Sequence, residues 1–495
     1  MGYTIEQQPN KFVACNSPLV YVVKESDGAI TGAAKFRYIV QVQVSTTNTG
    51  ALATIGKLKI HKNQSGVGIV DVHKIVRTYL ETQLQNVNDK SFSIHNVGIS
   101  VPAKPFSKNN NQAVAIRILG GYEKATSQTT SPVEELSPTG TFTTNIAIGI
   151  PATTPYSKSA SNVGGLDDAV VNANFPLTYF INDTTNEDDY GFLTNAPSVQ
   201  FVRGSSTSAD NVDEGTICFK QGNNASSSII TVGEKIEHIA IQYFNSSGNL
   251  IAGTVGGASI HFFDNSVANG GSTAAESTTV QKSILYFGCG TKNLQTQTLE
   301  LTAQPSNFSN WAYYRICGTT TDADTGGQPD TRCTKFYNFY RYGSGATVDD
   351  RHQSCTRYDN IRLAWRNRLG AWDYMNFRGK SVESVDITSE EMESVPGTWD
   401  NGSFSYDNWD RGKETLFTEA KRKLTINSDW LNEDEGAWLE ELFTSTNVQI
   451  IGDNSVVYPV VITNKNYTKK TSVNDKIKIQ YTVNLEYANK VRTNS

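Results

Sequence analysis

The chain has 495 residues, of which 38% are hydrophobic and 19% are charged, and its formal net charge is −6. One hydrophobic core rarely organises this length, so we expect roughly three domains, and the dispersed lysines and arginines argue against a specific nucleic-acid partner. The sequence shows neither a signal peptide nor an apolar run of about 18 residues, so we expect synthesis and folding in the cytoplasm without a membrane partner.

The N-terminal segment has the two-residue periodicity of half-buried strands. Strands are predicted at residues 12–14, 19–23, 36–44 and 53–60, and the Ser-Asp-Gly sequence at 26–28 predicts a hairpin turn. In the third of these strands one face is apolar throughout and contains Phe36, Tyr38, Val40, Val42 and Val44.

Apolar residues then recur at three- and four-residue spacing, which predicts an amphipathic helix over residues 71–83. The periodic residues are Ile69, Val72, Ile75, Val76, Tyr79 and Leu80. Asp71 is placed to cap this helix, which we expect to pack on the sheet formed by the preceding strands.

From residue 100 to 310 the sequence alternates between short apolar segments and polar turns. Strands are predicted at 114–119, 146–150, 198–202, 236–244 and 283–287. The polar cluster at 245–249 is expected to close a hairpin, and the low-complexity stretches at 125–131 and 265–279 are expected to be exposed loops or linkers. This spacing is typical of a β-sandwich or a partly closed barrel.

Residues 311–377 concentrate aromatic and cationic side chains, so a large buried cluster is expected there. Within this region, residues 360–377 are predicted to form two strands around a turn at 367–370, with Gly370 at positive φ.

The C-terminal part repeats a helix-on-sheet pattern. A strand is predicted at 423–426, and Asn432 and Glu435 have capping-box spacing for a helix ending near Thr444. Further strands are predicted at 448–451, 458–462 and 477–486.

The fold expected is therefore mainly β, with several β-sandwich or barrel-like domains and two short helices packed on sheets. We assign residues 1–100 to an N-terminal ring-forming β domain with one helix. Residues 101–310 form an inserted sandwich-type region of one or two domains, and residues 311–495 an aromatic-rich C-terminal β domain with one helix.

Sequence motifs for common enzyme chemistry are absent. There is no Walker loop, no GxGxxG after a strand, no GxSxG elbow and no HExxH. The six histidines are isolated from one another, and the acid pairs at 349–350, 390–391 and 440–441 are better explained as solvated surface. We therefore expect a protein that is not an enzyme and needs no cofactor.

Two groups of residues leave alternatives open. Asp322 and Asp324, followed by glycines, could begin a calcium loop, but no suitably spaced glutamate follows and a solvated turn is favoured. The six cysteines lack metal-binding spacing and are expected to be buried thiols, although Cys317 and Cys333 could lie close enough to form a disulfide.

The hairpin from residue 360 to 377 is the most site-like segment of the sequence. Its candidate contact residues are Arg362, Trp365, Arg366, Arg368 and Trp372. Aromatic and arginine side chains together could stack on bases or sugars. The favoured interpretation is a core or subunit contact, because both residue types are enriched at protein interfaces.

This hairpin also carries a family resemblance. The pattern Leu-x-Trp-x-Asn-x-x-Gly-x-Trp from Leu363 to Trp372 resembles segments of tailed-bacteriophage structural proteins. Residues 430–442 and 458–464 are similar to the same proteins and, more loosely, to the hub domains of distal tail proteins and baseplates. The resemblance carries no site residues over.

The resemblance implies a structural virion protein of the phage tail, at the tail tip, baseplate or distal tail. It implies a homo-oligomeric ring, three-fold or six-fold, that anchors other tail proteins. The alternative is a receptor-binding or carbohydrate-binding adhesin of the virion that contacts host surface glycans, and a polysaccharide depolymerase is a third hypothesis without a motif behind it.

Overall fold

The described residues of the computed structural model lie mainly in strands that form several separate sheets, which confirms the predicted fold class. The structure describes residues 2–9, 12–46, 51–85, 94–108, 113–136, 146–153, 192–204, 212–220, 236–251, 259–266, 284–296, 311–322, 324–325, 328–329, 331–342, 357–410, 412–452, 455–464, 466, 479–489 and 491–493. Within these ranges no helix is both long and apolar enough to cross a membrane.

The chain divides into two compact units rather than three consecutive segments. Unit 1 comprises Met1–Gln353 and Arg366–Asp373, and unit 2 comprises Ser354–Trp365 and Tyr374–Ser495. Sheets in unit 1 cross the boundaries expected at residues 100 and 310, because strands distant in sequence pair with one another. Amino-acid composition does not show which distant strands pair, so it does not locate the boundaries of such a unit.

The N-terminal part of unit 1 holds two sheets. The first has the order β1 (Tyr3–Gln7), β3 (Val20–Glu25), β6 (Val67–Asp71). The second has the order β2 (Phe12–Ala14), β10 (Ala147–Ile150), β8 (Val114–Ala125), β4 (Ala34–Ser45), β5 (Ala53–Ile60), with β9 (Val133–Leu136) also paired to β8. The apolar face predicted for β4 is buried in the shared core, so this prediction is confirmed.

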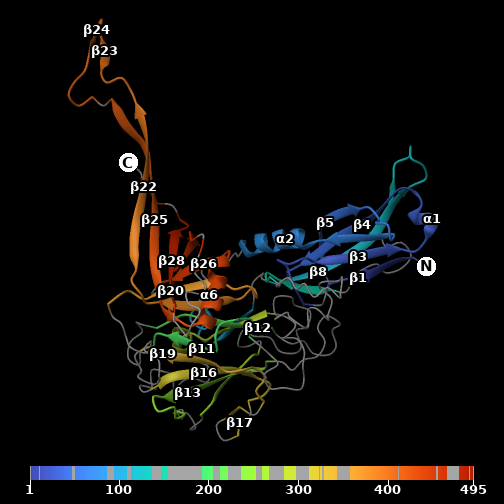
Figure 1. The fold of residues 1–495 in the computed structure, drawn as a ribbon, viewed down its shortest axis with the longest axis horizontal. Helices are drawn as coiled ribbons and strands as arrows, with labels where there is room; N and C mark the ends of the chain where they lie inside the picture. Colours follow the sequence, from blue (N-terminus) through green and yellow to red (C-terminus); the bar gives the residue numbers. More distant parts are fainter. Residues whose placement is uncertain are drawn as a thin grey trace. The chain divides into compact units, whose positions relative to one another are not determined.

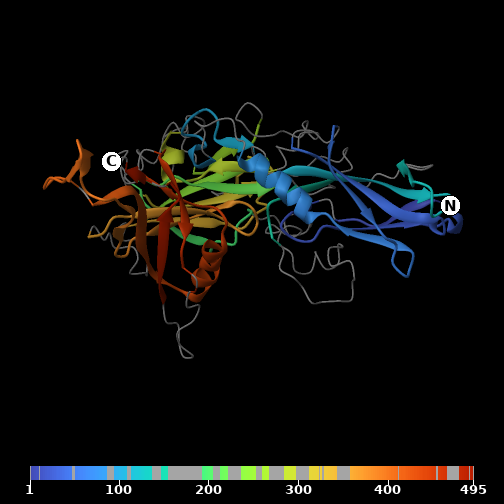
Figure 2. The ribbon, with the colours of Figure 1, turned by 90° about the horizontal axis from the view of Figure 1, so that it is seen from above.

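Helix α2 (His73–Gln85) lies alongside this sheet, where Figure 2 shows it in blue beside the blue strands. Val72, Val76 and Leu80 are buried, whereas Ile69 belongs to β6 and is exposed. The Asp71 carboxylate accepts a hydrogen bond of 3.0 Å from the backbone N–H of His73, as expected of a residue at the helix start.

The turn predicted at residues 26–28 is wrong. Asp27 instead caps the short helix α1 (Gly28–Thr31), its side chain accepting from the backbone N–H of Ala29. The strands on either side, β3 and β4, belong to different sheets, so no hairpin joins them. An Asp-Gly pair serves a helix start as well as a turn, because both need a local side-chain acceptor.

The middle of unit 1 contains two further sheets that share one core, as in a β-sandwich. The larger has the order β11 (Val199–Val202), β19 (Tyr337–Arg341), β16 (Trp311–Thr319), β13 (His238–Asn245), β14 (His261–Asp264). The smaller has the order β12 (Thr216–Lys220), β15 (Ile284–Gly288), β7 (Phe106–Lys108), and a two-residue ladder joins β17 (Asp324–Thr325) to β18 (Gln328–Pro329). Aromatic residues from both sheets, including Phe219, Phe287, Tyr314 and Tyr337, fill the space between them.

Buried His261 should make unit 1 sensitive to mild acid. Burial lowers the pKa of His261 to about 4, whereas in an unfolded chain it is about 6.5. Below pH 6.5 only the unfolded chain gains the proton, so stability is lost as pH falls from 6.5 to 4, by about 3 kcal/mol in total. Chemical denaturation at pH 7, 5.5 and 4 should show this loss for the native chain and a shallower loss for His261→Gln; equal slopes would contradict the prediction.

The cysteines within the described residues are unbridged. Cys15, Cys218, Cys289, Cys317 and Cys333 are buried free thiols, and burial raises the pKa of Cys317 to about 12. Cys355 lies outside the described residues. Cys317 and Cys333 both contribute to the packed interior rather than to a disulfide.

Unit 2 is built on one long sheet with the order β21 (Trp372–Phe377), β20 (Ile361–Arg366), β26 (Val448–Ile451), β27 (Val457–Ile462), β28 (Ile479–Tyr487), β25 (Lys413–Leu431), β22 (Val382–Glu393), with β29 (Val491–Thr493) also on β25. Helix α6 (Glu433–Thr444) begins with the predicted capping box between Asn432 and Glu435. Trp438 on α6 packs against Trp365, with ring centroids 4.9 Å apart. A small ladder joins β23 (Thr398–Asp400) to β24 (Ser403–Ser405).

Candidate interaction surface

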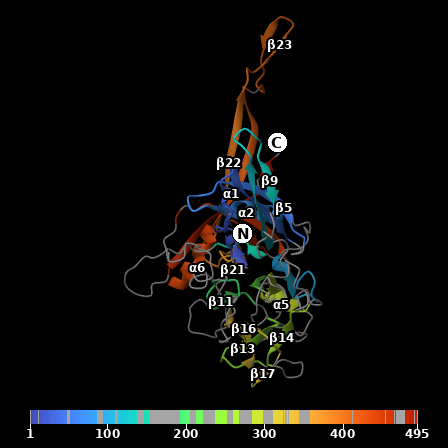
Figure 3. The same ribbon diagram turned by 90° about the vertical axis from the view of Figure 1, so that its right-hand side faces the viewer.

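Within the part of the chain that the structure describes, the most exposed segment is a two-stranded ribbon in unit 2. Strands β22 and β25 run antiparallel and carry β23 and β24 at their far end, as Figures 1 and 3 show. All twelve residues of β22 are exposed to solvent. We call residues 382–419 the arm, and residues 394–412 within it the tip.

The arm exposes apolar side chains that a folded protein normally buries. On the ribbon, Val385, Ile387 and Leu416 are 49%, 68% and 59% exposed. An isolated two-stranded ribbon is marginally stable in water, and exposed apolar patches mark interaction sites. The arm therefore has the properties of a surface that another molecule covers.

The tip presents four aromatic side chains within eleven residues. Trp399 lies directly opposite Phe404 on the β23–β24 ladder. Trp399, Tyr406 and Trp409 are 71%, 71% and 77% exposed, and Phe404 is 51% exposed. Aromatic side chains provide large, rigid contact areas at low entropic cost, so they are effective anchors in interfaces.

Local hydrogen bonds and a glycine shape this tip. The Asp410 carboxylate accepts a hydrogen bond of 2.7 Å from the backbone N–H of Asp407, and the backbone N–H of Asp410 donates back to the Asp407 carbonyl. Gly397 has φ of 106°, and a Cβ there would lie 2.8 Å from the Phe404 ring. The backbone at Gly397 thus needs glycine, and the aromatic residues stand on a defined turn.

The arm is strongly acidic. It contains ten Asp and Glu against two Lys and Arg, a net charge of −8. Lys423 at its base pairs with Asp386, and Lys413 pairs with Glu391 across the ribbon. Hydrogen bonding to Asp386 raises the pKa of Lys423, so this cation stays charged. Most of the carboxylates nevertheless face solvent.

The arm is also an edge. β22 ends the sheet order of unit 2, so one side of its backbone pairs with β25 and the other is the margin of the sheet. The ladder contains a bulge between Glu390 and Glu391, beyond which the tip begins. Long exposed edges can accept another strand, and bulges and charges limit indiscriminate pairing.

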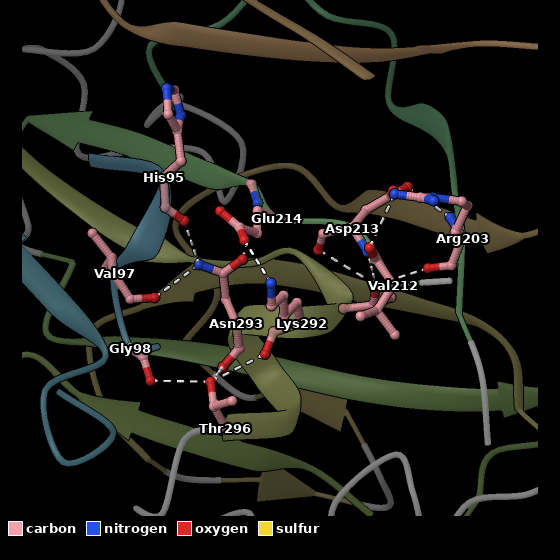
Figure 4. Close-up of polar contacts among 12 residues, drawn as sticks. His95, Val97, Gly98, Arg203, Val212, Asp213, Glu214, Lys292, Asn293 and Thr296 are labelled. Atoms are coloured by element: carbon pink, nitrogen blue, oxygen red, sulfur yellow. Dashed lines mark hydrogen bonds and ion pairs between the residues drawn. The ribbon is translucent and has the colours of Figure 1, made fainter. Parts of the chain in front are cut away.

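Unit 1 contains a contrasting polar cluster that is buried and internally bonded (Figure 4). The side chain of Asn293 on α5 (Thr291–Thr296) is fully buried. Its amide donates 2.8 Å hydrogen bonds to the carbonyls of His95 and Val97, and its oxygen accepts from the backbone N–H of Gly215 at 2.9 Å. One side chain thereby links three segments distant in sequence.

Two ion pairs complete this cluster. Fully buried Asp213 accepts from both the backbone N–H and Nε of Arg203, each at 2.7 Å. Lys292 Nζ lies 2.9 Å from the Glu214 carboxylate, and Thr291 Oγ1 accepts from the Asp213 backbone N–H at 2.8 Å. These carboxylates are engaged by internal partners, which is typical of a structural cross-link rather than of acid–base chemistry.

The structure buries the tryptophans that the sequence singled out. Trp365 is 0% exposed and belongs to the core of unit 2, and Trp372 is 7% exposed and meets the ring of His95 edge-on at 5.0 Å in unit 1. Neither indole offers an open face to a sugar. Arg362 is 5% exposed and lies over the ring of Tyr374, with its guanidinium carbon 5.2 Å from the ring centroid.

The other two arginines of that hairpin differ. Arg366 is partly buried and Arg368 is exposed. The turn between them is the predicted one: Gly370 has φ of 81°, and the side-chain oxygen of Asn367 accepts from the backbone N–H groups of Leu369 and Ala371, both at 3.0 Å. The candidate contact residues are therefore divided between buried and surface positions.

The proposed calcium loop shows no ligand cluster in the described part of the chain. Asp322 is exposed, and the side chain of Asp324 lies outside the described residues. Among the residues that the structure does describe, no group of three or more His, Cys, Asp or Glu is placed to hold a metal ion.

The arm was not predicted from the sequence, although its composition is unusual. Residues 399–409 carry as dense an aromatic cluster as the hairpin at 360–377, and the carboxylates gather at 383–419. A search for clustered Asp and Glu, rather than for clustered Lys and Arg alone, would have found this acidic segment.

Comparison with known proteins gives no further guide. No protein-family model matches the chain. No curated protein is significantly similar to it.

Proposed function

We propose that this chain is a self-assembling structural protein, not an enzyme, and that the arm is its main assembly element. The observation that carries the proposal is the exposure of a twelve-residue edge strand together with apolar residues on the ribbon and tip. Burying such a surface against another subunit would satisfy the backbone edge and remove apolar area from water.

The setting that fits this role best is a phage virion, as a tail-tip, baseplate or distal tail ring protein. The support is the resemblance at residues 355–377 and 424–486. In such a particle, copies of the chain form a three-fold or six-fold ring and hold other tail proteins. Localisation to the virion tail follows from the same proposal.

Replacing the apolar residues of the arm should abolish assembly while leaving the fold intact. We expect the native chain to form a discrete oligomer by native mass spectrometry and negative-stain imaging. The variant Ile387→Thr, Leu416→Thr, Trp399→Ser, Trp409→Ser should be a monomer, because each exposed aliphatic or aromatic group contributes about 1–3 kcal/mol when buried.

A matched control alters exposed apolar residues outside the arm. Val101→Thr and Val461→Thr change residues that are 46% and 57% exposed and should leave the oligomer unchanged. A native chain that remains monomeric at every concentration, or an arm variant that assembles normally, would overturn the proposal.

A second candidate is a glycan-binding adhesin that uses the tip. The observation favouring it is the exposure of Trp399, Tyr406 and Trp409 beside Asp and Asn side chains, since flat aromatic faces and polar loop groups suit sugars. A glycan array separates the two functions: saturable binding lost in Trp399→Ser but kept in Trp430→Ser would favour the adhesin.

A further inference from the structure

The arm carries all of the excess negative charge of the chain. Its net charge is −8 while that of the whole chain is −6, so the remaining residues are together at +2. Such an asymmetry directs association, because an acidic surface attracts a basic one and repels its own copy.

This charge disfavours pairing of β22 with β22 of a second copy. Two-fold edge pairing would bring Glu383, Asp386, Glu390, Glu391 and Glu393 against the same five residues. Like charges opposite one another across a strand pair are destabilising. A symmetric arm-to-arm contact is therefore the wrong solution, and the surface that covers the arm should be basic.

A basic surface lies on the N-terminal sheet of unit 1. The even-numbered residues of β4 and β8 fill the core of that part of the unit, so their odd-numbered residues and the residues paired with them on β5 beyond Gly56 lie on the other side of the sheet. Among them are four cations, Arg37, Lys57, Lys59 and Arg117, which the register places on the same side of the sheet. We call these four residues the basic face.

Two carboxylates accompany the cations on this face. Lys59 Nζ is 2.5 Å from Glu123 and 2.8 Å from Glu134, and these hydrogen bonds raise the pKa of Lys59. Lys57 also pairs with Glu134. The side chain of Glu123 is only 3% exposed, whereas that of Glu134 is 33% exposed, close to the 35% and 37% of Lys57 and Lys59. The four cations outnumber these two carboxylates, so the group keeps a net positive charge.

The edge of this sheet is available to the arm. β5 is the edge strand of its sheet, just as β22 is the edge of its own. β5 has eight residues and β22 has twelve, which corresponds to about 27 Å and about 40 Å. The edge of β5 can therefore lie along about two thirds of β22.

We propose that the arm of one copy docks along β5 and the basic face of a neighbouring copy. This inference rests on the proposed self-assembly and specifies the contact that produces it. The contact is heterologous, since a different surface is used on each partner. Repeated around an axis, such contacts close into a ring.

Charge reversal on either side should break the contact. The arm variant is Glu383→Lys, Glu390→Lys, Glu393→Lys, which keeps both ion pairs of the ribbon. The face variant is Arg37→Glu, Lys57→Glu, Arg117→Glu, which keeps Lys59 between its two carboxylates. Each should weaken self-association in sedimentation velocity by at least about tenfold, and raised salt should weaken the native oligomer.

A mixture of the two variants provides the decisive test. The acidic arm of the face variant complements the basic face of the arm variant, and the reversed arm complements the reversed face, so an equimolar mixture should regain an oligomer in which the two variants alternate. A chain carrying all six reversals should regain the full oligomer. Thermal melts check that each variant is folded, and if the face variant is not, Arg37→Gln, Lys57→Gln, Arg117→Gln replaces it.

The outcomes separate this inference from the proposed function. A native oligomer that both variants form equally well, or a six-fold reversal that fails to restore assembly, overturns the arm-to-face contact and leaves self-assembly standing. A native chain that never associates overturns both.

Discussion

Asn293→Leu is expected to lower the free energy of unfolding of unit 1 by at least about 3 kcal/mol. The side chain is fully buried and bonds the carbonyls of His95 and Val97 and the N–H of Gly215. Leucine branches at the same atom but is larger, and it leaves these three groups without their partner, at about 1–3 kcal/mol each. Guanidinium denaturation followed by circular dichroism measures the loss.

Two further variants make this prediction specific. Asn293→Asp preserves the shape but places a carboxylate against two carbonyl oxygens, so it should destabilise at least as much as leucine at pH 7. Asn408→Leu changes an exposed asparagine and should remain within about 0.5 kcal/mol of the native chain. A loss below about 1 kcal/mol for Asn293→Leu would show that the three segments are held together by other contacts.

Trp365→Ala should cost unit 2 about 3–5 kcal/mol, because removal of a large buried aromatic side chain leaves a cavity that the surroundings fill only in part. Trp365 is 0% exposed and contacts Trp438 on α6. The expected result is an earlier denaturation midpoint, with hydrogen exchange in α6 accelerated.

Trp430 provides the matched comparison in the same unit. It is 56% exposed, and Trp430→Ala should change stability by less than about 1 kcal/mol. Trp365→Phe should retain part of the lost stability, since a ring still fills the site. If Trp365→Ala and Trp430→Ala were equally mild, the indole at 365 would not be a core residue in solution.

Local patterns predicted local structure well. The alternation in β4 placed its apolar face in the core, and the Asn432–Glu435 spacing gave the start of α6. Gly370 adopts the positive φ expected of its turn. Each of these depends on residues within a few positions of one another, where side-chain volume and hydrogen bonding act directly.

The pairing of the strands could not be predicted from the sequence. β16 lies between β13 and β19, although composition placed a boundary just before it. For the same reason the aromatic residues near 365 and near 404 were indistinguishable by type, yet one group is buried and the other exposed. Whether a side chain is buried depends on which other elements pack on its strand, and amino-acid composition does not show which elements these are.

β25 gives the arm a mechanical connection to the rest of its sheet. One strand of nineteen residues pairs with β22 in the arm and, although both ladders contain a bulge, continues without a loop into the ladder with β28. Its hydrogen bonds lie across the strand direction, so a pull on the tip shears many of them together instead of opening them one after another. A force applied at the aromatic tip would thus reach the interior of the sheet without crossing a loop.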